Sequence, residues 1–287
     1  MPLGSMPGEW EPEAGAPEAG AQDSSAPTAA ALPTRVEIIP TAGIVDAVLT
    51  QLSVSTTVTV TCLPHHGLER TMAAALELAD HGYNVVPHLA ARSVESRQQL
   101  AAMVRSCVAG GITEIFAVGG DKQSAAGPYG SSASVMKDLA ELSGGLLSMG
   151  VGGYPEGHPA ITDAQLLDDL RAKAALADYL VTQMCFSPDV IAAYLATLWE
   201  EGIDLPVWVG VAGAVPRTKL ISLATRIGVG SSLRFISGKG SLGLRLLGGS
   251  RYSPDALVAG MAALPAPPAG IHFYSFNSLD SLVPTSA

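Results

Sequence analysis

The sequence predicts a (β/α)8 TIM barrel, and three observations support this. Eight short apolar runs are each followed by a stretch of helical character, and the alternation fills about 250 residues, a normal length for such a barrel. Polar residues gather where the runs end, which is the edge at which TIM barrels carry their active sites. The runs are Arg35–Pro40, Thr56–Cys62, Asn84–Ala90, Glu114–Gly120, Ser148–Pro155, Tyr179–Phe186, Pro206–Gly213 and Ile271–Phe276.

Helices are expected between these runs, over 43–52, 69–80, 96–109, 163–176, 188–201 and 218–227. Gly110 and Gly111 terminate the third of them, and Ser187 followed by Pro188 begins the fifth. The least regular part of the barrel is residues 228–253, which are rich in Gly and Ser and carry four cations. This segment is either a lid that faces the substrate or a plain loop with a short helix.

Residues 1–33 are predicted to be a disordered tail, and residues 34–287 a single catalytic barrel. The tail is rich in Ala, Pro, Gly and Glu and has no hydrophobic period, so it cannot bury a core of its own. Its opening, Met1–Met6, resembles a cloning scar ahead of a second start and is left out of the fold argument.

Composition argues against several classes of function. Of the net charge of −10, five negative charges lie in residues 1–34, so the barrel is only mildly acidic and has no basic stripe for nucleic acid. No apolar run reaches the roughly 18 residues of a membrane span, and no signal peptide pattern opens the chain, so a cytoplasmic protein is expected. Three widely spaced cysteines and the lack of a zinc motif predict neither disulfides nor a metal site.

Two carboxylates are the first candidates for catalysis. Glu37 interrupts the first apolar run, where a charge is costly unless it faces the barrel mouth or has a partner. Asp121 follows Gly119 and Gly120, and paired glycines let a backbone approach a flat ligand closely. At the mouth, one carboxyl group could donate a proton while the other stays ionised beside a developing cation. The alternative for Glu37 is a structural pair with a neighbouring Arg.

For the other polar and aromatic residues at the strand ends, the sequence allows two interpretations, a ligand contact or a structural role. His88 and His158 either contact a ligand in the mouth or are satisfied by backbone groups. The amide of Gln183, inside an apolar run, suits a pterin or another lactam edge, or else a neighbouring loop. Tyr154 and Phe186 either stack on an aromatic ligand or pack in the core.

At these residues the chain resembles the methylenetetrahydrofolate reductase family, in a divergent short form. The most specific matches are Tyr-Pro-Glu-Gly-His-Pro after the fifth run and Val-Thr-Gln-x-x-Phe in the sixth, at the family's interval. The other matches run in family order across nearly the whole barrel: Val-Glu-Ile-Ile-Pro, Glu-Arg-Thr, Pro-His-Leu, Gly-Gly-Asp, Gly-Ile-Asp-Leu-Pro-Val and His-Phe-Tyr-Ser-Phe-Asn.

The resemblance implies reduction of 5,10-methylenetetrahydrofolate to 5-methyltetrahydrofolate, a step that feeds methionine synthesis. It gives Glu37 the role of the general acid that opens the imidazolidine ring, and Asp121 the role of stabilising the iminium cation. The substrate contacts implied are Gln183, Phe186 and Asn277, and the residues on the flavin and nicotinamide face are Thr61, His88, Gly120, Tyr154 and His158.

The chain departs from the family pattern where the family holds its flavin. Each lost charge-assisted contact costs roughly 1.5–3 kcal/mol, and several together favour an enzyme that transfers hydride directly from NADH, without FAD. NADPH as the donor and conventional use of FAD stay open. Gly119 stands where the family has an Arg, and Cys62 where it has a Tyr. Ser278 replaces an Arg that the family associates with folate. Helix 163–176 presents Gln165, Asp168, Arg171 and Lys173, in a stretch one residue shorter than that of the family.

Two further alternatives remain from the sequence. One is methyl transfer to or from tetrahydrofolate, including demethylation of aryl methyl ethers, which would proceed without consumption of NADH. The other is a folate-binding protein without catalysis, against which the retained Glu37 and Asp121 argue. The expected partners are therefore a folate and a nicotinamide nucleotide, with no nucleic acid and no membrane, and the oligomeric state is left open.

Overall fold

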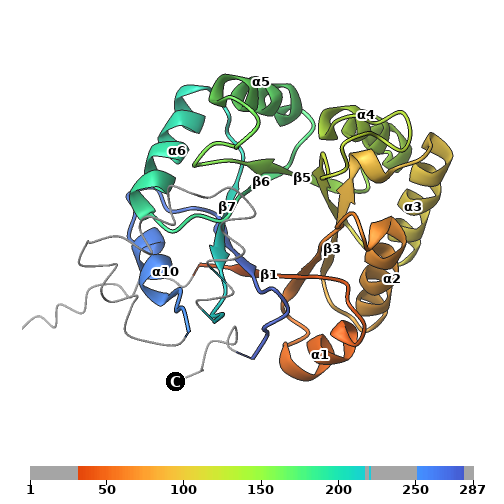
Figure 1. Ribbon diagram of the computed structural model, residues 1–287, viewed down its shortest axis with the longest axis horizontal. Helices are drawn as coiled ribbons and strands as arrows, with labels where there is room; N and C mark the ends of the chain where they lie inside the picture. Colours follow the sequence, from red (N-terminus) through yellow and green to blue (C-terminus); the bar gives the residue numbers. More distant parts are fainter. Residues whose placement is uncertain (1–31, 217–219, 221–250, 281–287) are drawn as a thin grey trace, which may run out of the picture. The chain divides into compact units, whose positions relative to one another are not determined.

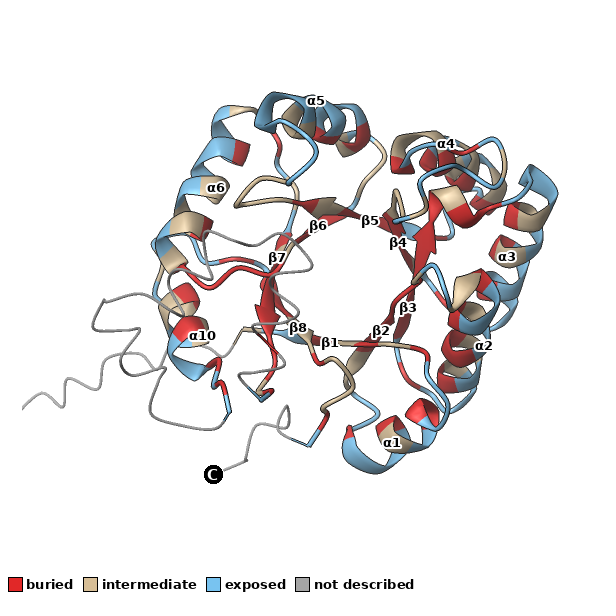
Figure 2. Ribbon diagram, in the orientation of Figure 1, coloured by how far each residue is buried: buried red, intermediate tan, exposed pale blue. Residues whose placement is uncertain are grey.

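A computed structural model of the protein describes residues 32–216, 220 and 251–280, and these form a closed barrel of eight parallel strands (Figures 1 and 2). The strands pair in chain order, and β8 pairs with β1 to close the ring. The predicted TIM barrel is confirmed. Its strands are β1 (Thr34–Ile38), β2 (Thr57–Val60), β3 (Val85–Ala90), β4 (Glu114–Val118), β5 (Ser148–Gly153), β6 (Tyr179–Thr182), β7 (Val207–Ala212) and β8 (Gly270–Tyr274).

Helices surround the strands on the outside of the barrel (Figure 1). No bounds were predicted for η1, α4 or α10, and the other described helices begin and end within about two residues of the prediction. The expected tail, apart from residues 32 and 33, the helix over 218–227, apart from residue 220, and most of segment 228–253 lie outside the described residues. The helices are α1 (Ile44–Gln51), α2 (Gly67–Asp80), η1 (Ala91–Ser93), α3 (Arg97–Ala109), α4 (Ser132–Ser143), α5 (Asp163–Ala174), α6 (Pro188–Glu200) and α10 (Asp255–Ala262).

Side-chain caps fix the points at which the loops of the mouth become helices. The Ser96 hydroxyl accepts from the backbone N–H of Gln99 at the start of α3, and Ser187 accepts from that of Val190 at the start of α6. Such caps stabilise a helix by about 1 kcal/mol each. At α5 the cap is a reciprocal box between Thr162 and Gln165, so the Gln165 amide oxygen is held by the helix start rather than presented to a ligand.

The strands alternate between an outer and an inner face. Val58 and Val60 of β2 pack in the large core between strands and helices, so Thr59 between them points into the barrel. In β1 the same alternation turns Arg35 and Glu37 inward. A carboxyl group and a guanidinium group thus lie inside the barrel, at successive inward positions of one strand.

Except for β3, the predicted runs extend beyond the C-terminal ends of the strands. β6 ends at Thr182 rather than Phe186, although the N–H of Gln183 still donates to the Gly153 carbonyl of β5 and that of Cys185 to the Gly210 carbonyl of β7. The residues just past the strands therefore belong to the loops around the barrel mouth. Among the described residues no helix combines the length and the apolar character that crossing a bilayer demands.

Candidate active site in the barrel mouth

Glu37 lies inside the barrel against two histidines from other strands. Its Oε2 atom is 3.2 Å from Nε2 of His272 on β8 and 3.7 Å from Nε2 of His88 on β3. The two imidazoles are almost entirely enclosed, at 1% and 7% exposure. Only the His272 distance is that of a hydrogen bond. The other carboxylate oxygen, Oε1, has no hydrogen-bond partner in the described part of the chain.

His88 is held as a neutral imidazole. Burial lowers its pKa to about 4; the nearby Glu37 carboxylate opposes this shift, and His272 adds to it. Its ring also packs against Phe116, with centroids 4.8 Å apart. The family resemblance implied a place for His88 on the flavin and nicotinamide face, and in the structure its Nε2 lies 3.7 Å from Oε2 of Glu37.

The ends of β8 and β1 are clamped together beside Glu37. The Asn277 side chain accepts from the N–H of Ile39 at 2.8 Å and donates to its carbonyl at 2.9 Å, and it also donates to the Thr41 hydroxyl. The Ser275 hydroxyl donates to the Glu37 carbonyl. The Asn277 amide, expected to bind substrate, is therefore engaged with backbone, and it fixes the position of the strand that carries Glu37.

Tyr274 connects the Glu37 side of the mouth to β6. Its hydroxyl donates to the Thr182 carbonyl at 3.0 Å. The Tyr274 ring lies against Gly210 of β7, where a Cβ would be 2.7 Å from a ring carbon. Glycine at 210 therefore makes this crossing sterically feasible. Burial raises the pKa of Tyr274, and the carboxylate of Glu37 adds to the effect, so the phenol stays protonated.

Asp121 and Tyr154 lie on the β4–β5 side of the same mouth. Burial raises the pKa of Tyr154, with further contributions from Asp169 and Asp121. The Tyr154 ring meets His158 edge-on, with centroids 5.5 Å apart, and His158 Nδ1 accepts from the backbone N–H of Ala160. Asp121 is exposed and makes no hydrogen bond or ion pair with any described residue, so its carboxylate is available to a ligand.

Gln183 and Phe186 follow β6 and have different environments. Oε1 of Gln183 accepts from the N–H of Met184 at 2.8 Å, while its amide NH2 group has no partner within the described ranges. Gln183 thus retains donors for a lactam carbonyl. Phe186 is 5% exposed and meets Tyr252 edge-on at 5.7 Å within a small apolar cluster, which is the core-packing alternative.

Thr61 and Gly120 mark the ends of β2 and β4. The Thr61 hydroxyl is buried and has no hydrogen-bond partner among the described residues. Gly120 has φ +85°, and a Cβ there would lie 3.0 Å from that of Ala90. At Gly119 a Cβ would meet nothing within 4 Å, so the space for a larger side chain is open.

The cations of α5 are engaged away from the mouth. Arg171 pairs with Asp168 at 2.7 Å and with Glu201, and Lys173 pairs with Asp169. Arg171 stands eight residues past the start of α5 at Asp163, about 12 Å down the helix axis. Because helices of this fold run antiparallel to the strands, these two cations lie well below the mouth.

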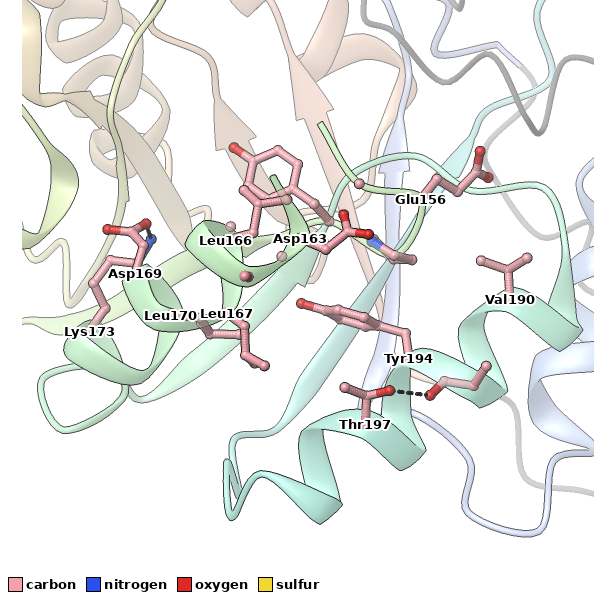
Figure 3. Close-up of a pocket in the computed structure, with 17 residues that line it drawn as sticks. Glu156, Asp163, Leu166, Leu167, Asp169, Leu170, Lys173, Val190, Tyr194 and Thr197 are labelled. Carbon is pink, nitrogen blue, oxygen red and sulfur yellow. Dashed lines mark hydrogen bonds and ion pairs between the residues drawn. The ribbon is translucent and has the colours of Figure 1, made fainter. Parts of the chain in front are cut away.

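A groove of about 600 Å³ separates α5 from α6 beneath the loop that follows β5. Figure 3 shows Tyr194 reaching from α6 towards Leu167 and Asp163 of α5. The paired Lys173 and Asp169 also line it. Its charged groups are predominantly acidic, which disfavours a phosphate ligand. In the described residues no group of three or more His, Cys, Asp and Glu side chains is arranged to hold a metal ion.

Sequence comparison matches residues 44–227 to the methylenetetrahydrofolate reductase family, which is more than half of the chain. The chain belongs to the methylenetetrahydrofolate reductase family. The match covers the predicted site residues from Thr61 to Phe186, whereas Glu37 and Asn277 lie outside it. In this reductase the barrel itself joins them, because β1 and β8 are neighbours that flank the matched region.

Two of the solved structures that match the chain are only distantly similar to it. A putative phosphonomutase from Burkholderia cenocepacia J2315 is 17% identical, with a TM-score of 0.40 over 62% of this chain and 78% of its own. A mandelate racemase/muconate lactonizing enzyme from Bordetella bronchiseptica RB50 is 12% identical, with a TM-score of 0.44 over 85% of this chain and 53% of its own. At these values neither similarity bears on the function of the reductase.

Sequence reasoning did not single out His272 or Tyr274, although both contribute to the site. The signal was present in the last strand, where Ile271 is buried in the outer core and strict alternation turns His272 and Tyr274 inward. The structure also excludes the structural alternative for Glu37. The neighbouring Arg35 pairs with Glu114 at 2.9 Å instead.

Proposed function

We propose that this protein reduces 5,10-methylenetetrahydrofolate to 5-methyltetrahydrofolate with hydride taken directly from NADH. The observation that carries the proposal is the arrangement of Glu37, whose Oε2 is hydrogen-bonded to His272 while Oε1 has no partner among the described residues. A carboxyl group held in this way can donate a proton to a substrate in the mouth. Membership of the family supplies the substrate class.

The residues around the mouth suit the steps of this reaction. Glu37 protonates a nitrogen of the imidazolidine ring, the C–N bond breaks, and an iminium cation forms on the pterin side. Asp121, exposed and unpaired among the described residues, stabilises that cation as a carboxylate. Gln183 offers its free NH2 group to the pterin edge. The dihydronicotinamide supplies the hydride that converts the iminium carbon into a methyl group.

Two features of the described residues disfavour a flavin diphosphate. The two cations of α5, Arg171 and Lys173, are neutralised by acidic partners and lie below the mouth. Gly119 offers no charge at the end of β4. Within the described ranges, the pairing of the α5 cations and the missing charge at Gly119 support transfer from NADH to the iminium within a ternary complex. NADPH is the other donor to be tested, and we place the reaction in the cytoplasm.

The test is an absorbance spectrum of the purified protein, followed by NADH oxidation with methylenetetrahydrofolate in the presence and absence of FAD. We expect no flavin absorbance near 450 nm, turnover without added FAD, and intersecting initial-rate plots. A stoichiometric flavin spectrum or ping-pong kinetics would instead identify a conventional flavoenzyme. Failure to oxidise NADH with this substrate would reject the reductase activity itself.

A further inference from the structure

We propose that His272 is a positioning residue for Glu37, which it orients through Oε2 and stabilises as a carboxylate once the proton has been given to the substrate. The inference rests on the proposed function and deepens it, because it assigns the group that prepares the acid. His272 lies on β8 and Glu37 on β1, and the two strands are hydrogen-bonded neighbours.

The contact is enclosed and specific. His272 is 1% exposed, and its Nε2 lies 3.2 Å from Oε2 of Glu37. Its other nitrogen, Nδ1, is buried without a hydrogen-bond partner in the described chain. With a hydrogen on Nε2, the ring donates to Glu37 and makes no second hydrogen bond to a described residue. Because Nδ1 contacts no further polar group of the described chain, His272 offers no proton relay there, and we expect Glu37 to be reprotonated from the mouth.

The other charged or titratable groups near Glu37 do not compete for this role. On β1, Arg35 is engaged with Glu114 of β4 at 2.9 Å. On β3, the neutral His88 stands beyond hydrogen-bond distance at 3.7 Å. On β8, the Tyr274 hydroxyl donates to the Thr182 carbonyl. Among the described residues, His272 is thus the one side chain that donates to the carboxyl group of Glu37.

This geometry gives the two carboxyl oxygens of Glu37 different roles. Oε2 receives the N–H of His272, so Oε1 is the atom that carries the proton to the substrate nitrogen. When that proton leaves, the charge that develops on the carboxylate is met by a donor already in place. Preorganised donors of this kind accelerate proton transfer without a cost of reorganisation.

The test compares His272→Leu, which removes the donor, with His272→Gln, whose amide N–H can occupy the Nε2 position. Thr59→Val is the matched control, because Thr59 pairs with Glu37 in the β1–β2 register and its buried hydroxyl has no partner among the described residues. For each folded variant, kcat and KM are measured against pH. Expected for His272→Leu are a loss of kcat of at least tenfold and a shift of about one unit to higher pH in the descending limb.

His272→Gln should restore most of kcat and return the descending limb to its original position, while KM for the folate stays within twofold in every variant. Thr59→Val should match the wild type. Superimposable pH profiles for His272→Leu and wild type, or equal losses in the Leu and Gln variants, would overturn the proposal.

A second readout does not depend on turnover. In protein labelled with ¹⁵N-histidine, Glu37→Gln should shift the ring nitrogen resonances of His272, assigned with the His272→Gln variant, and Thr59→Val should leave them in place. If Glu37→Gln shifts the His272 resonances but the wild type shows no folate-dependent NADH oxidation, the proposed function is rejected, while the contact between His272 and Glu37 is confirmed. Turnover in the wild type with no such coupling would reject the positioning role alone.

Discussion

Arg35 pairs with Glu114 across the barrel floor, and not with Glu37 two positions along its own strand. The guanidinium lies between the rings of Tyr179 and Trp208, at 4.5 and 4.0 Å from their centroids. The cation of β1 is thereby neutralised and shielded within the lower layer. Glu37, in the layer above, is left to the histidines and to the substrate.

The first prediction concerns the acid itself. Glu37→Gln should lower kcat by a hundredfold or more, because the amide has no proton to give and general acid catalysis contributes roughly 10²–10⁴-fold. The fold should persist, since an amide can still accept from His272. Steady-state NADH oxidation measures the effect. Glu141→Gln, which alters an exposed pair with Arg97, is the control and should leave kcat unchanged.

The second prediction concerns the stability that the Arg35–Glu114 ion pair contributes at the floor of the barrel. Arg35→Met leaves Glu114 buried without its partner and should lower the free energy of unfolding by about 3–5 kcal/mol. The double variant Arg35→Met/Glu114→Gln should recover much of this loss. Urea unfolding measures both values. Equal instability of the single and double variants would argue against the pair as the cause.

The third prediction concerns acid stability. The folded-state pKa of His88 is lowered to about 4 from 6.5, so on acidification the unfolded chain takes up this proton first. Stability is therefore lost as the pH falls from about 6.5 towards 4, by about 2 kcal/mol at pH 5. His88→Gln should remove this share of the pH dependence in urea unfolding at pH 8 and pH 5. An identical loss in variant and wild type would contradict it.

The fourth prediction uses the open space at Gly119. Arginine fits there without backbone strain, because the position has no positive φ and a Cβ would meet nothing within 4 Å. Gly119→Arg restores the charge that the family pattern carries, and should tighten FAD binding by about ten- to hundredfold. Fluorescence titration with FAD measures it, with Gly119→Gln as the neutral control. Equal affinity in the two variants would mean that other residues limit flavin binding.

The sequence predicted the barrel because its signals are local. Each apolar run and each helix pattern can be recognised within about ten residues, and the mouth follows from the ends of the runs. Glu37 and Asp121 were found in this way. His272 was not, because its partner is 235 residues away and the barrel alone brings them together. Asn277 and Phe186 were assigned to substrate from motif position, whereas hydrogen bonding and packing engage them with the protein.

The hydrogen bonds that join the ends of β8 and β1 have a consequence for the order of folding. The bonds that hold Ile39 to Asn277 and Glu37 to His272 join residues 238 and 235 positions apart, so loop closure must bring together nearly the whole barrel before they form. During synthesis, β1 leaves the ribosome long before β8 exists. The nascent chain therefore carries Glu37 without its donor, and the pair is complete only once the last strand has been made.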